Sequence, residues 1–169
     1  MKNILVVSVI GQDKPGLVEQ LAAVISQQQG NWLESSFSRL AGQFAGIVKV
    51  AVKGDGALLL AALQALPGLD VRGVLDAEQA DDNEASLQSV ALTLVGHDRI
   101  GIVKDVSAIL ARFGVNVEKL ETWLDSAPMS GEMMFHAQAL LSAPVSVDLC
   151  HVRRDLESIA DDLMVEWAD

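Results

Sequence analysis

The sequence is poor in cysteine and in basic residues, and each shortage excludes a class of protein. Cys150 is the only cysteine in 169 residues, so neither an internal disulfide nor a thiolate metal cluster can form within one chain. Lys and Arg number 12 against 23 Asp and Glu, which gives a net charge of -11, and no segment gathers them into a basic stripe. Direct binding of nucleic acid is therefore not expected. The low cysteine content leads us to expect a reducing, cytoplasmic location.

Long apolar runs are also missing, although half of the residues are apolar. The N-terminal segment MKNILVVSVIGQDKPG holds a short apolar run followed by a charged turn, which is too short to span a membrane and has no signal-peptide cleavage site. We expect a folded protein without a membrane segment, in which this run is the first strand.

Motifs for catalysis, cofactors and metals are absent. No serine lies in a nucleophile-elbow pattern, no glycine-rich phosphate loop occurs, and no pair of carboxylates has a recognisable catalytic spacing. Of the three histidines, His97 lies in a turn, where it either contacts a ligand or is solvated, His136 alternates away from an apolar strand face, and His151 does not share a helix face with Cys150. We therefore predict a protein that is not an enzyme and holds no cofactor or metal.

A duplication organises the chain. Shifting the sequence by 85 residues places residues 4–31 over 89–116 without a gap. The match spans a strand pattern, a turn and a helix pattern together, which indicates a repeated domain. Six positions are identical: Gly11/Gly96, Asp13/Asp98, Gly16/Gly101, Val18/Val103, Ala23/Ala108 and Asn31/Asn116.

Within the first copy, apolar spacing predicts strand, helix, strand, strand, helix and strand. Residues 4–10 read as a strand, 17–25 as a helix, and 32–40 and 44–52 as a hairpin around Ala41-Gly42-Gln43. Asp55 is placed to cap a short helix that runs to Leu66, and 69–75 supplies the last strand.

The second copy repeats this order from about Leu87. Its last helix is predicted from Leu149, Val152, Leu156, Ile159 and Leu163, and a strand through Val165 and Trp167 follows. The segment DAEQADDNEAS between the copies has five acids and no base, which is typical of a solvated linker. The predicted fold is α+β: two tandem ferredoxin-like βαββαβ domains with antiparallel sheets, at 1–78 and 87–169, joined by a linker at 79–86.

Two segments, GQDKPGLVEQLAAVISQQQGN and GHDRIGIVKDVSAILARFGVN, resemble the strand-turn-helix core of ACT domains. Two such copies in an acidic chain of this length look like the glycine cleavage system transcriptional repressor family. The resemblance implies that a small amino acid, glycine being a candidate, binds where the first turn of one domain faces the second strand of a neighbour. Carried over to matching positions, the ligand-binding residues are Asp13, Gly16 and Asn31 in one copy and Asp98, Gly101 and Asn116 in the other.

The chemistry of these residues suits an amino acid. Backbone N–H groups at the start of a helix, next to a glycine, suit a carboxylate, while Asp13 can accept from an ammonium and Asn31 can donate and accept. The plainer interpretation is that the glycines only permit the turn, Asp13 caps the helix and Asn31 tolerates a left-handed corner. Both interpretations stay open on the sequence, and Ile100 in place of Pro15 makes the second turn less rigid than the first.

Three functional hypotheses follow. The first is an amino-acid-responsive regulator of transcription in glycine or one-carbon metabolism, which acts by contact with a transcription activator protein rather than with DNA. The second is a detached regulatory, amino-acid-binding subunit of a metabolic enzyme. The third is an assembly module without a ligand, such as a homodimer paired through exposed sheet edges.

Overall fold

The computed structural model describes residues 3–75 and 86–168, which divide into two compact units. Each unit has the order βαββαβ, and its four strands form one antiparallel sheet. The predicted fold class is confirmed. The elements of unit 1 are β1 (Asn3–Gln12), α1 (Leu17–Gln27), β2 (Asn31–Leu40), β3 (Gln43–Val52), α2 (Ala57–Gln64) and β4 (Leu69–Leu75). Those of unit 2 are β5 (Leu87–His97), α3 (Ile102–Arg112), β6 (Asn116–Ser126), β7 (Met133–Pro144), α4 (Leu149–Glu157) and β8 (Met164–Ala168).

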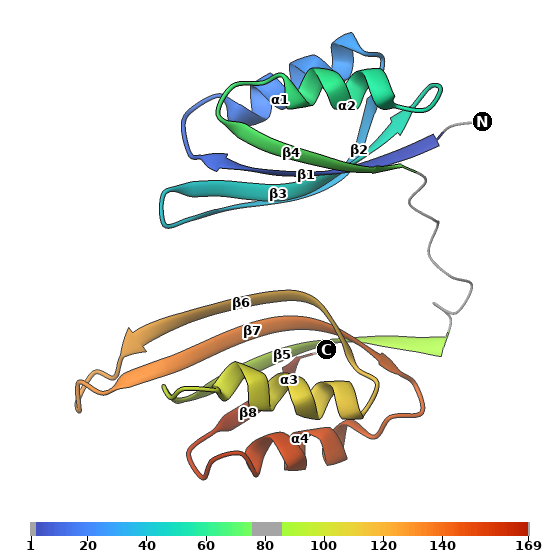
Figure 1. Cartoon of the computed structure of the whole chain (residues 1–169). Helices are drawn as coiled ribbons and strands as arrows, with labels where there is room; N and C mark the ends of the chain where they lie inside the picture. Colours follow the sequence, from blue (N-terminus) through green and yellow to red (C-terminus); the bar gives the residue numbers. More distant parts are fainter. Residues whose placement is uncertain (1–2, 76–85, 169) are drawn as a thin grey trace. The chain divides into compact units, whose positions relative to one another are not determined.

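The strand order is the same in both sheets, β2-β3-β1-β4 and β6-β7-β5-β8. The first strand of each unit therefore lies in the centre, and the second strand, β2 or β6, lies at an edge. Figure 1 shows that both helices of a unit cover one face of its sheet and leave the other face without a helix.

Each core forms between the helices and the covered face of the sheet, because alternate strand residues point to that face. On β1 the buried residues are Leu5, Val7 and Val9, and on β5 the corresponding residues Val90, Leu92 and Leu94 are buried. The helices add apolar residues one turn apart, such as Leu17, Leu21 and Ile25 of α1 at a spacing of four. This is the packing that the sequence pattern predicts.

The two hairpins differ in length. Ala41 and Gly42 form a two-residue turn with φ 51° and 77°, which sets Leu40 opposite Gln43. In unit 2 the connection is longer, residues 127–132, and Met129 within it is fully exposed. Both hairpins carry a β-bulge at the same place, between Trp32 and Glu34 in one and between Val117 and Lys119 in the other.

Two helix predictions need correction. The last helix, α4, ends at Glu157, so Ile159 and Leu163 lie beyond it. Leu163 lies in the turn before β8 and is buried in the core from there, so its helical spacing does not reflect a helix. The short helix α2 also ends earlier than Leu66, and its N-cap is Gly56, although the Asp55 side chain does accept from the N–H of Ala57, at 3.0 Å.

The helix α4 begins with a side-chain cap. Asp148 accepts a hydrogen bond from the N–H of Cys150 at 2.9 Å, and Cys150 itself is exposed. None of the helices in the described part of the chain is both long and apolar enough to cross a membrane. The predicted domain limit at residue 78 and most of the predicted linker at 79–86 lie outside the described residues; Ser86 is described, and its carbonyl accepts from the N–H of Val145.

Candidate functional site

A glycine in the left-handed conformation precedes the first helix of each unit. Gly16 has φ 87° and Gly101 has φ 86°, so both residues turn the chain sharply into α1 and α3. Just before each glycine, the N–H of Asp13 donates to the carbonyl of Gly42, and the N–H of Asp98 donates to that of Met133, at 2.9 and 3.0 Å. We call residues 13–16 the first corner and residues 98–101 the second corner.

Both corners are open. A Cβ atom built on Gly16 or on Gly101 would have no neighbouring atom within 4 Å. No side chain among the described residues caps α1 or α3, so the first N–H groups of these helices are not occupied by the protein itself. A carboxylate can therefore approach the backbone there, as the predicted chemistry requires.

The two predicted asparagines lie elsewhere. Asn31 is the first residue of β2 and pairs with Ala51, at the end of the sheet where β1 begins, whereas Asp13 follows the end of β1. At about 3.3 Å per residue along β2, this places Asn31 about 25 Å from Asp13. Asn116 has the corresponding position on β6, opposite Ser142. Within one unit the structure therefore brings together the aspartate and the glycine, and not the asparagine.

The aspartates differ in their surroundings. In the first corner, the Asp13 carboxylate forms an ion pair with Arg39 of β2, with 3.0 Å between Oδ2 and Nε. Leu124 has the corresponding position on β6, where it pairs with Phe135 just as Arg39 pairs with Phe44. Asp98 therefore has no equivalent of Arg39.

A hollow of about 410 Å³ adjoins the second corner. Asp98 and Gly101 line it together with residues that the sequence did not single out for this role, among them Lys104, Thr122 and Trp123. The Trp123 ring is 41 % exposed and stacks on His136, with 5.3 Å between the ring centres. The period-two pattern of residues 116–126 could have indicated which of these side chains share a face, but not that α3 would lie beside them.

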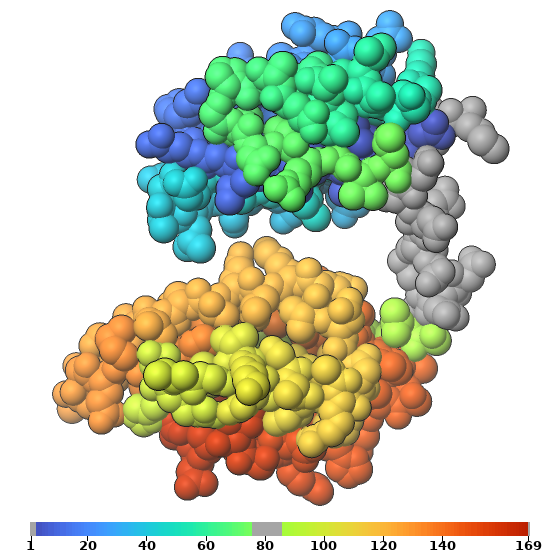
Figure 2. Space-filling view, viewed as in Figure 1, coloured from blue at the N-terminus to red at the C-terminus, as the bar shows by residue number. Residues whose placement is uncertain are grey.

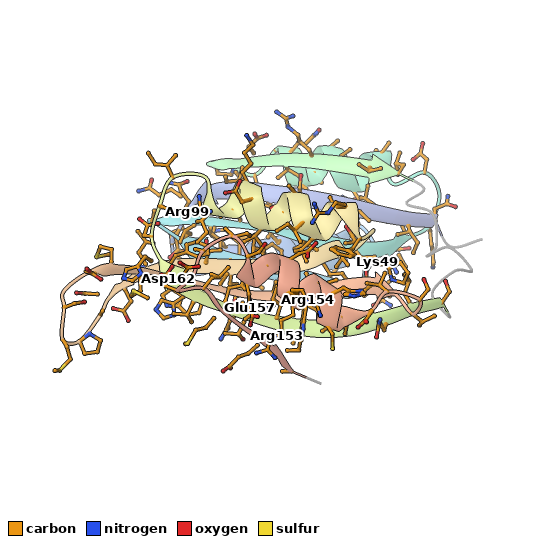
Figure 3. The ribbon with its side chains drawn as sticks, turned by 90° about the horizontal axis from the view of Figure 1, so that it is seen from below. Lys49, Arg99, Arg153, Arg154, Glu157 and Asp162 are labelled. Carbon is orange, nitrogen blue, oxygen red and sulfur yellow. The ribbon has the colours of Figure 1, made fainter. Side chains whose placement is uncertain are left out.

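Arg99 also lines this hollow, although it is held by its own neighbour. Its Nη2 atom lies 2.8 Å from Oδ2 of Asp105 on the first turn of α3. Figure 3 shows Arg99 in the segment that leads into α3. Within residues 3–75 and 86–168, Lys104 forms no ion pair, so it is the cation of the hollow that stays available to an anion.

His97 joins three segments of unit 2. Its backbone N–H donates to Asp162 at 2.7 Å, its Nδ1 contacts the same carboxylate, and its Nε2 lies 2.6 Å from Glu132. Only the protonated ring donates from both nitrogens, so the hydrogen bonds that the ring donates to Glu132 and then to Asp162 raise the pKa of His97. The hydrogen bond from the backbone N–H of His97, and then the one from its ring, lower the pKa of Asp162. His97 thus links the β5 end to Glu132 and Asp162. This role differs from both roles that the sequence left open for this histidine, which were contact with a ligand and exposure to solvent.

Among the described residues, no group of three or more His, Cys, Asp or Glu side chains is arranged to hold a metal ion. The site therefore consists of backbone N–H groups, one carboxylate, one free ammonium and an apolar wall. The chemical groups of this set are complementary to the two charges of a small zwitterion.

Comparison with known proteins places the chain in a family. The ACT domain model matches residues 3–70 and 88–167, so the chain belongs to the ACT domain family and carries two copies of the domain. It is an ACT-domain regulatory protein. A UPF0237 protein of Streptococcus mutans serotype c is 33 % identical over 76 residues, which cover 44 % of this chain and 78 % of that protein.

Two crystal structures match the whole chain. A protein from Galdieria sulphuraria has a TM-score of 0.86 and 28 % identity, with 100 % of both chains covered. A candidate glycine cleavage system transcriptional repressor has a TM-score of 0.67 and 11 % identity, covering 100 % of this chain and 99 % of that one. The second likeness shows the tandem fold alone, and it agrees with the family that the sequence resembles.

Proposed function

We propose that the protein is an amino-acid-responsive regulator that binds a small amino acid at its glycine corners and acts through contact with another protein. The observation that carries this proposal is the pair of open corners at Gly16 and Gly101, each with helix N–H groups that no side chain caps. The proposal includes no catalytic step and no cofactor. The partner is a transcription activator protein, and the process is glycine or one-carbon metabolism, as the likeness to the candidate repressor suggests.

Asn31 and Asn116 do not contact a ligand at the corner of their own unit. Since each lies at the far end of its own sheet, it can contact a ligand only at a corner of another unit or another chain. Binding of the amino acid can regulate contact with a partner if it favours one state of the protein over another.

Calorimetric titration of the whole chain with individual amino acids tests the binding step. Asp13→Asn and Asp98→Asn each remove a charge without changing shape, and each should weaken binding at its own corner. Asp70→Asn, on the exposed outer face of β4, is the matched control. Absence of heat with every amino acid, or unchanged affinity in both corner variants, would refute binding at the corners.

Affinity capture from the native cell, with and without the amino acid that binds, tests the partner. Recovery of a DNA-binding activator in an amino-acid-dependent amount supports the transcriptional role. Recovery of a metabolic enzyme instead would assign the chain to the class of detached regulatory subunits. Capture that does not respond to the amino acid would separate binding from regulation and contradict the proposal.

A further inference from the structure

A row of aromatic rings fills the space between the first helix and the edge strand in unit 1. Trp32 and Phe37 of β2 and Phe44 of β3 point to the helix-covered face, with ring centres 5.9 and 5.1 Å apart, and all three are half-buried against the core. Phe37 lies directly over Gly46, where a Cβ atom would approach the ring to 2.4 Å. Unit 1 thus supplies its own apolar filling at this place.

Unit 2 has lost most of this filling. The strand pairings match Trp32 with Val117, because each lies opposite the corresponding buried residue, Val50 or Leu141. In the same way Phe37 corresponds to Thr122, which is far smaller. Every residue of β6 is exposed, in contrast to the half-buried Trp32 and Phe37 of β2.

A narrow apolar slot of about 30 Å³ remains between α3 and β6. Figure 2 shows the atoms of α3 (yellow) and β6 (orange) next to each other on the visible face of unit 2. The wall of the slot is apolar except for Ser107 and Thr122. Its other lining residues are Leu92, Leu94, Val103, Val106, Leu110, Val117, Leu120, Phe135 and Ala139.

The slot lies next to the second corner, because Val103, Thr122 and Phe135 line both the slot and the hollow of about 410 Å³. An apolar recess is therefore continuous with a rim that carries the Asp98 carboxylate and the Lys104 ammonium. The rim matches the two charges of an amino acid, and the recess matches an apolar side chain.

We propose that the second corner and its slot bind an α-amino acid with a branched aliphatic side chain, of the size of valine or leucine. The ammonium pairs with Asp98, the carboxylate lies toward Lys104 and the start of α3, and the side chain enters the slot. The proposal deepens the proposed function, on which it rests, by naming the class of ligand. Glycine would leave the slot empty. A slot of about 30 Å³ has room for about two water-sized groups, at roughly 10–15 Å³ each, which matches the two methyl groups at the end of a branched side chain and not the six carbons of an aromatic ring.

Titration of the whole chain with L-leucine, L-valine, L-phenylalanine and glycine tests the class. Leucine or valine should bind at least about tenfold tighter than glycine, since a single methylene in an apolar pocket already changes affinity roughly 10-fold or more. Thr122→Phe restores the ring of unit 1 and should abolish this preference. Glu121→Phe places the same ring one residue earlier, on the opposite face of β6, and should leave the preference intact.

A second variant keeps the test decisive if Thr122→Phe destabilises unit 2. Ala137 underlies Thr122 where unit 1 has Gly46, so the double variant Thr122→Phe/Ala137→Gly reproduces the pair that unit 1 accommodates. It should fold and should also lose the preference for leucine.

The outcomes separate this inference from the proposed function. Equal binding of glycine and leucine, unaffected by either form of Thr122→Phe, would overturn the inference and leave amino-acid binding at the corners in place. Preferential binding of phenylalanine would also overturn it. Absence of binding by every amino acid would remove both.

Discussion

Replacing Phe37 by threonine, the residue of unit 2, should destabilise unit 1 by about 2.5–5.5 kcal/mol. Complete removal of a buried phenylalanine ring costs about 3–5 kcal/mol, and Phe37 is only half-buried, so roughly half of that applies. Loss of its two ring pairs, with Trp32 and Phe44, adds about 0.5–1.5 kcal/mol for each pair. The bare Gly46 beneath the ring gains no new contact in exchange.

Amide hydrogen exchange with mass spectrometry gives the assay, because it assigns the loss to a segment. The most protected amides of β3 should lose the stated free energy, while those of β5 and β7 should not change. Ser38→Thr, at the next position of β2 and on the opposite face, is the control and should change stability by less than about 0.5 kcal/mol. A loss below about 0.5 kcal/mol for Phe37→Thr, or an equal loss in unit 2, would refute the claim that the ring fills unit 1.

Three further predictions concern single positions. The hydrogen bonds to Glu132 and Asp162 raise the pKa of His97 above its usual 6.5, so the stability that they contribute is complete below that pH and is lost as the pH rises through the folded-state pKa. His97→Gln should remove this part of the pH dependence of unit 2, as followed by chemical denaturation from pH 6 to 9. A pH dependence that persists in this variant would rule out the contribution of His97. Gly16→Ala should lower the free energy of thermal unfolding by about 1–2 kcal/mol, since only the positive φ opposes this substitution. Gly46→Ala should lower it by more, because the added Cβ would lie 2.3 Å from a backbone oxygen. The reverse order of the two losses would contradict the packing. Arg39→Leu should change stability by no more than about 1 kcal/mol, because the Arg39 side chain is 74 % exposed. The substitution removes the ion pair with Asp13 and should tighten amino-acid binding at the first corner. Weaker binding would show that Arg39 itself holds the ligand.

The fold could be predicted from the sequence because a duplication repeats the signals of the first strand, the glycine turn and the first helix. The glycine before each first helix, the strand alternation and the hairpin turn at Gly42 all agree with one topology. The end of α4 could not be predicted, because a residue buried from a turn, such as Leu163, has the same spacing as a helix residue. Periodicity reports burial, and not which backbone conformation achieves it.

The candidate site was only partly predictable. The aspartates and glycines of the two corners follow from spacing along the chain, and the structure places each pair together. The distance between Asp13 and Asn31 depends instead on the parallel course of β1 and β2 across β3, which no local pattern contains. The sequence favours the first corner, because Pro15 makes that turn rigid. In the structure, however, Arg39 forms an ion pair with Asp13 at the first corner, and a hollow of about 410 Å³ adjoins the second corner.

The position of Cys150 gives a practical route to these measurements. As the sole thiol of the sequence, exposed in the first turn of α4, it accepts one maleimide dye at a known place on the unit with the slot. Fluorescence anisotropy and energy transfer from the natural tryptophans can then be recorded on the unsubstituted protein.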